Sequence, residues 1–204
     1  MFEFDPFPTG DPPSLEALVA AIIAGFPPEA RDRATATLRD QILPWRLRSL
    51  ATHPHPRRLA EVVYQDVTDR LRAVASTVRL AALDALACET TAERLVGEAT
   101  TLAIARYLAD HPLARGGDAW RADASPWLKL PPTQRDAEIA ARLGALDALV
   151  ASAPAECGRA IGQKVLHARL ALGSARTGSF TTAAGMLLDF LRSTGEHPQE
   201  LDVH

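Results

Sequence analysis

Apolar residues recur every three or four positions over a long stretch of the chain, and this spacing constrains the fold more than any other feature. The series consists of Leu59, Val63, Val67, Leu71, Val74, Val78, Ala82 and Ala85. Because an α-helix has about 3.6 residues per turn, such a series lies along one helix face and predicts a single helix of about seven turns. Between Leu80 and Cys88 only Asp84 is polar. A helix that is apolar nearly all round must be covered nearly all round, so this end is predicted to lie at the centre of a bundle, with Leu83 and Leu86 deepest in the core.

Two helices are predicted before this long one. Ser14 is a suitable N-cap for a helix that stops at Gly25. Pro28 suits the first turn of a second helix, which Pro44 is expected to end or kink because proline lacks a backbone N–H. A continuation of this helix is expected from Trp45 to Leu50. The prolines in residues 53–56 then enforce an extended connection.

Further helices are predicted after the long one. Thr90 with Glu93 fits a capping box that opens a fourth helix. Thr133 is expected to cap a fifth helix, whose predicted apolar face consists of Ile139, Leu143, Leu146 and Val150. Pro154 is expected to start a sixth, whose predicted apolar face consists of Cys157, Ile161, Val165, Ala168 and Leu172. A seventh helix is predicted over residues 182–193. Alternating strand patterns are missing from the sequence. The fold is therefore predicted to be all-α, a single-domain bundle of about seven helices around a long central helix.

The domain organisation follows from the same reading. A chain of 204 residues can form one hydrophobic core without a second domain. We expect an extended N-terminal arm over residues 1–13, a helical bundle domain over residues 14–195 and a C-terminal tail over residues 196–204. Within the bundle, residues 113–132 lack helical periodicity and are predicted to form an irregular loop.

The aromatic residues are concentrated in the two irregular segments. The loop contains Trp120 and Trp127, and the arm contains Phe2, Phe4 and Phe7, in a chain with only 5% aromatic residues. Rigid aromatic side chains are common anchors of protein interfaces. These five residues are the predicted partner-binding residues. The alternative is that the rings fill gaps in the chain's own bundle.

An arginine cluster with one tryptophan flanks the proline-rich connection: Trp45, Arg46, Arg48, Arg57 and Arg58. Exposed arginines can neutralise phosphates, and an indole ring can stack on a base. The alternative is that these arginines cap helix C-termini and pair with the acidic ends of the chain. The whole chain has a net charge of −3, which does not favour nucleic acid.

No set of residues with catalytic or metal-binding spacing is found in the sequence. His53 and His55 are separated by a proline, and spacing fixes no acidic third ligand beside them. Glu-x-x-His pairs of the di-iron type and the nucleophile-elbow motif of serine hydrolases are missing. We therefore expect no catalytic residues, no metal site and no cofactor.

The N-terminal residues and the cysteines bear on the compartment. The first residues have neither a basic region nor an apolar core, so they do not read as a signal peptide. Cys88 and Cys157 lie in predicted helices and are expected to be thiols. A cytoplasmic protein without membrane contact is expected. The excess of arginine over lysine is typical of a GC-rich, bacterial-type coding genome.

Three functions remain open at this point. The leading hypothesis is a non-catalytic helical accessory protein that binds a partner protein or self-associates. The first alternative is a helical subunit of a nucleoprotein complex, which would use the arginine cluster. The second alternative is a helical domain that binds a small molecule.

Overall fold

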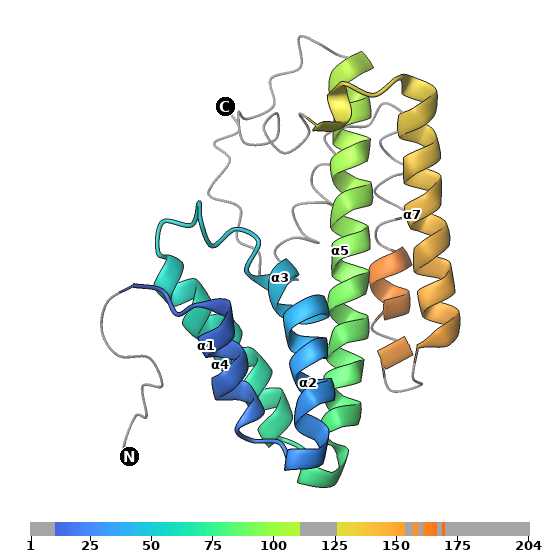
Figure 1. Cartoon of the computed structure of the whole chain (residues 1–204). Coiled ribbons are helices and arrows are strands. Elements are labelled where there is room, and N and C mark those ends of the chain that lie inside the picture. Colours follow the sequence, from blue (N-terminus) through green and yellow to red (C-terminus); the bar gives the residue numbers. More distant parts are fainter. Residues whose placement is uncertain (1–10, 111–125, 154–156, 159–160, 167–168, 170–204) are drawn as a thin grey trace. The chain divides into compact units, whose positions relative to one another are not determined.

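The computed structural model describes residues 11–110, 126–153, 157–158, 161–166 and 169 (Figure 1). In this part of the chain the fold is all-α, as predicted, with no strand. The bundle contains a long helix as predicted, α5, Arg79–Asp110, of 32 residues, but this helix begins only near the end of the stretch predicted to be helical, Leu59 to Ala85. The chain divides into two compact units, residues 1–91 (unit 1) and residues 92–204 (unit 2), and the boundary falls within α5. The predicted helix at residues 182–193 and the C-terminal tail lie outside the described residues.

Unit 1 contains a series of short helices before α5. They are α1 (Leu15–Ile23), the 3₁₀ turn η1 (Pro28–Ala30), α2 (Arg31–Thr37), the π-helical segment η2 (Leu38–Ile42), α3 (Leu43–Arg46), α4 (Pro56–Arg72) and the 3₁₀ turn η3 (Ser76–Val78). The predicted cap of α1 is confirmed, because the Ser14 hydroxyl accepts a hydrogen bond from Ala17 N–H at 3.1 Å. This bond satisfies one of the free amides at the start of the helix.

After α2 the helix passes into the π-helical segment η2 and then into α3, which ends two residues beyond Pro44. Segment η2 contains a π-type turn in which Leu43 N–H donates to Leu38 O, and α3 continues the helix to Arg46. Pro44 has no N–H to donate one turn back, so the usual hydrogen-bond ladder is interrupted here. The expected continuation of the helix to Leu50 is wrong, because residues 47–52 form turns.

The predicted single helix from Leu59 to Ala85 is also wrong, because it is two helices separated by a break. Helix α4 ends at Arg72, and the chain passes through the extended Ala75 and the turn η3 before α5 begins. The break contains Ser76 and Thr77, whose hydroxyl groups weaken helix formation, and Thr77 also has a branched Cβ. Arg79 folds back, and its Nε donates to Leu71 O at 3.1 Å, which satisfies a carbonyl at the end of α4.

The core of unit 1 gathers apolar residues from α1 and the connection after it, α2, η2, α3, α4 and the first turns of α5. Leu83 is 0% exposed and Leu86 is 2% exposed, which confirms their predicted position in the deep core. The other buried members are Leu18, Val19, Ile22, Phe26, Ala34, Leu38, Ile42, Leu43, Ala60, Val63, Val67, Leu71 and Ala87.

Helix α5 continues without a break through the predicted capping box. Thr90 Oγ1 donates to Leu86 O and Thr91 Oγ1 donates to Ala87 O, both at 2.8 Å. A threonine inside a helix satisfies its hydroxyl by bonding to the carbonyl one turn back, so Thr90 does not cap a new helix. The predicted helix start at this position is wrong.

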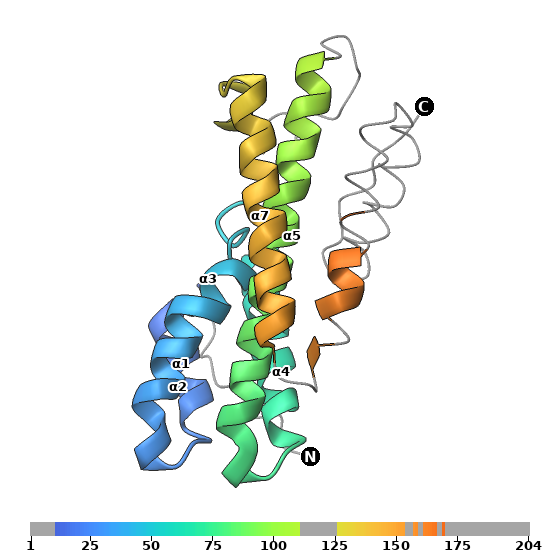
Figure 2. The same cartoon turned by 90° about the vertical axis from the view of Figure 1, so that its right-hand side faces the viewer.

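Unit 2 pairs the second part of α5 with α7 (Pro132–Ser152), and the two helices lie side by side in Figures 1 and 2. They are antiparallel, because Glu98 pairs with Arg142 while Arg106 pairs with Asp136. Helix α7 begins at Pro132 with no side-chain cap, so the predicted cap at Thr133 is wrong. Proline suits the first position of a helix because its amide would be unpaired there in any case.

A further helical stretch of unit 2 is described at residues 157–158 and 161–166. Its predicted apolar face is buried at the described positions, Cys157, Ile161 and Val165, which are 2%, 0% and 6% exposed. Together with Leu146 of α7 and Val96, Ala99 and Leu102 of α5, these residues form the buried apolar part of unit 2. The predicted members Ala168 and Leu172 lie outside the described residues.

Candidate interaction site

The arginine cluster does not form one exposed patch in the structure. Arg46 is directed into unit 1, where its Nη1 donates to Asp66 Oδ2 at 2.5 Å and its Nε donates to Thr90 Oγ1 at 3.3 Å. Its side chain is only 15% exposed. Arg46 therefore joins α3 to α4 and α5 within unit 1, as a charged residue that pairs with an acid.

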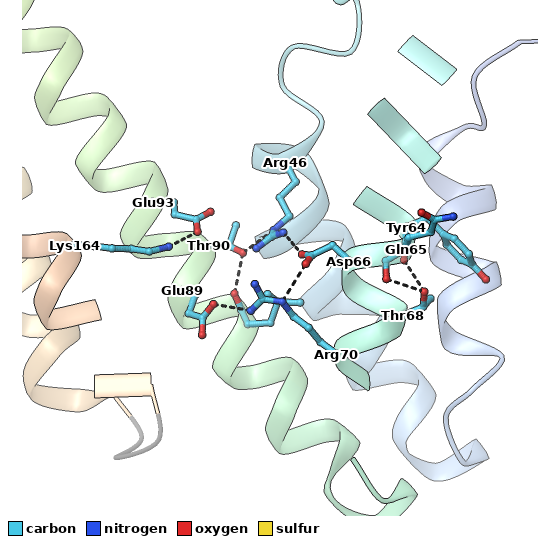
Figure 3. Close-up of polar contacts among 11 residues, drawn as sticks. Arg46, Tyr64, Gln65, Asp66, Thr68, Arg70, Glu89, Thr90, Glu93 and Lys164 are labelled. Carbon is cyan, nitrogen blue, oxygen red and sulfur yellow. Dashed lines mark hydrogen bonds and ion pairs between the residues drawn. The ribbon is translucent and has the colours of Figure 1, made fainter. Parts of the chain in front are cut away.

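Arg46 belongs to a network of charges that continues through Asp66 to Arg70 and Glu89 (Figure 3). Arg70 Nε lies 3.2 Å from Asp66 Oδ1, and its Nη1 lies 2.8 Å from Glu89 Oε2. Partial burial opposes the charged form of Arg70, but its hydrogen bond to Glu89 and the charges of Asp66 and Glu89 raise the pKa above its usual value. The network therefore gives both arginines acidic partners within unit 1.

The other members of the cluster differ in their surroundings. Arg57 pairs with Glu61 one turn further along α4, at 2.7 Å. The Arg48 guanidinium stacks on Trp45, with Cζ 3.6 Å from the ring centroid, and Nη1 donates to Trp45 O. Arg58 is exposed. Of the predicted nucleic-acid residues, only Arg48 and Arg58 are exposed.

Trp127 is the predicted partner-binding residue that the structure describes. Residues 126–128 form a helical turn rather than irregular chain. The partly buried ring packs with Ile104 and Leu128 against the buried Ala105 of α5. Arg142 of α7 covers another part of the ring, with Cζ 5.1 Å from the ring centroid. Trp120, Phe2, Phe4 and Phe7 lie outside the described residues.

Arg142 is itself held by acids on both helices of unit 2. Its Nε lies 3.1 Å from Glu98 Oε2 on α5, and its Nη1 pairs with Glu138 one turn back on α7. A guanidinium fixed in this way stays over the indole ring, an arrangement that favours a cation–π contact. Trp127 is therefore held in one position by apolar contacts and a charge, while part of the ring remains exposed.

The structure also identifies a residue that the sequence reading missed. Arg135, in the first turn of α7, is 3% exposed. Its Nη1 donates to Leu128 O at 3.3 Å, and its Nε has no hydrogen-bond partner. A signal for its burial was present in the sequence, because Arg135 lies four residues before Ile139 and so shares the predicted apolar face of this helix.

Three observations describe the site's wider context. No three His, Cys, Asp or Glu side chains among the described residues are grouped as metal ligands would be. None of the helices in the described ranges combines the length and the apolar character that crossing a membrane requires. No protein-family model, no curated protein and no solved structure matches the chain.

Proposed function

We propose that this chain is a non-catalytic helical interaction protein of the cytoplasm, which binds another protein chain or a second copy of itself. The observation that carries the proposal is the position of Trp127. Its indole is fixed against Ala105 and beneath Arg142, yet it is only partly buried by its own chain.

An indole held in this way is suited to binding. Tryptophan offers a large apolar area, and a ring already fixed in one position loses little conformational entropy when a partner covers it. Interfaces depend on a few such anchors in their centre. The exposed part of Trp127 is therefore proposed as an anchor, and Trp120 with Phe2, Phe4 and Phe7 as further contacts in the segments outside the described residues.

Nucleic acid is a weaker candidate, for reasons of charge and geometry. Arg46 and Arg57 already pair with Asp66 and Glu61, so their charges are compensated within the chain. The stacked Arg48 guanidinium covers one face of Trp45 that a base would need. A small-molecule role has no comparable support among the described residues.

The proposal is tested by the native mass of the full chain, purified from its source cells and, separately, as a recombinant protein. A homodimer, or a complex with one defined second protein, is the expected result. A monomer in both preparations, at concentrations up to about 100 μM, contradicts the proposal, because even a modest interface with a micromolar dissociation constant would be populated there. Excess absorbance at 260 nm in the purified complex would favour the nucleoprotein alternative instead.

A further inference from the structure

The cationic side chains of unit 2 divide into paired and unpaired groups. The pairs are Arg94 with Glu98, Arg106 with Asp136, Arg142 with Glu98 and Glu138, Lys164 with Glu93, and Arg169 with Asp147. Among the described residues of this unit, only Lys129 and Arg135 have a cationic group with no carboxylate partner. Both lie beside Pro131 and Pro132, where α7 begins.

Arg135 is the unusual member of the two, because it is buried. The residue is 3% exposed, and among the described residues its guanidinium makes one hydrogen bond, to the neutral carbonyl of Leu128, while Nε makes none. A buried charge is strongly unfavourable unless an opposite charge and further hydrogen bonds compensate it. A single bond to a peptide carbonyl does not supply this compensation, whereas an oxyanion at the Nε edge would supply it.

The backbone around Arg135 also favours an anion. Because Nη1 reaches the carbonyl of Leu128, which precedes the helix, the guanidinium lies at the N-terminal end of α7. Gln134 and Arg135 N–H both donate to Pro131 O, while the proline residues carry no N–H. Thr133 N–H is the first amide of the helix, and no acceptor for it occurs among the described residues. The positive end of the helix dipole and a free amide thus lie at the same place as the buried guanidinium.

We propose that the N-terminal end of α7 is a binding site for one oxyanion group, a carboxylate or a phosphate. Arg135 supplies its Nε edge, where an arginine binds two oxygens of such a group side by side. Thr133 N–H supplies a further donor. Lys129, which is exposed and directly follows Leu128, adds a charge at the entrance. This site is independent of the proposed function, since it requires no protein partner at Trp127.

The test is thermal unfolding of the full chain in sodium chloride, in inorganic phosphate and with a hexaglutamate peptide, at one ionic strength. An anion that binds the folded chain raises the midpoint of unfolding, by about 3–6 °C at ten times its dissociation constant for a chain of this size. A shift with phosphate alone indicates a free anion as the ligand. A shift with the peptide at lower concentration indicates an acidic segment of a partner.

Variants of Arg135 assign the effect to this site. In chloride, Arg135→Met should unfold at the same temperature as the wild type or higher, because it removes a buried unpaired charge. The same variant should lose the shift produced by the anions. Arg135→Lys keeps the charge without the two-donor edge and should weaken binding by about fivefold or more. Arg106→Met is the matched control, because Arg106 is more exposed than Arg135 and already pairs with Asp136. This variant should retain the full shift.

Two results would overturn the proposal. One is an equal shift in the wild type and in Arg135→Met, since this would assign any stabilisation to general salt effects. The other is a midpoint for Arg135→Met that lies several degrees below the wild type in chloride, because Arg135 would then be a structural residue with a compensated charge.

Discussion

Replacement of Leu83 by alanine tests the central position of α5 in the core of unit 1. The substitution removes Cγ and both Cδ atoms from a side chain that is 0% exposed. At about 0.8 kcal/mol for each buried methylene-sized group, the lost transfer free energy is about 2–2.5 kcal/mol. The cavity left between α5 and its neighbours adds to this loss, so the free energy of unfolding should fall by about 2–5 kcal/mol.

Urea-induced unfolding, followed by far-ultraviolet circular dichroism, measures this loss. Val62→Ala on α4 is the matched control, because Val62 is 54% exposed and its loss should stay within about 0.5 kcal/mol. In a thermal scan Leu83→Ala should lower the midpoint by about 4–20 °C. A loss below about 0.5 kcal/mol for Leu83→Ala would refute the reasoning, since it would equal that of an ordinary surface substitution.

Three further changes test other parts of the structure. A double-mutant cycle of Arg46→Met with Asp66→Asn should give a coupling free energy of about 1–2 kcal/mol, because the pair is largely buried on the arginine side; a coupling near zero would contradict the network. Gly144→Ala, inside α7, should stabilise the chain by about 0.5–1 kcal/mol, because the added Cβ meets no atom within 4 Å. A measured destabilisation would contradict the open space at this position. Ser14→Ala should cost about 1 kcal/mol through loss of the cap of α1, and an unchanged stability would argue against the cap.

Helical periodicity predicted the fold class and the buried faces, but it did not predict where helices are interrupted. Val74 and Val78 keep the four-residue spacing across the break, so the series from Leu59 to Ala85 reads as continuous although the backbone turns. The pair Thr90 and Glu93 led to the opposite error, because a helix start was predicted where the helix is continuous. A capping-box spacing looks the same inside a helix, and only the lack of a turn residue before Thr90 indicates that α5 continues.

The candidate site was predicted only in part, because a sequence does not specify which acids lie near which bases. Arg46 was interpreted as a phosphate ligand, yet folding places Asp66 of α4 against it. Arg57 was interpreted in the same way, although Glu61, four residues later on the same helix, is a partner that its spacing indicates. Arg135 shows the converse, since it lies in a polar run of the sequence and is buried without a counter-charge. Ion pairing depends on contacts between distant segments, such as Arg46 and Asp66, whereas helix faces depend on neighbouring residues.

The most direct test of the proposed interaction function is the association constant of the full chain, with itself or with its co-purified partner, for Trp127→Ala. Sedimentation equilibrium on the folded fraction should show binding weakened at least tenfold, which corresponds to about 1.4 kcal/mol. Trp45→Ala is the matched control, a partly buried tryptophan of unit 1 outside the proposed surface, and it should leave association unchanged. If Trp127→Ala lowers the unfolding midpoint while association of the folded chain stays at the wild-type value, Trp127 only fills the chain's own structure, and the account is contradicted.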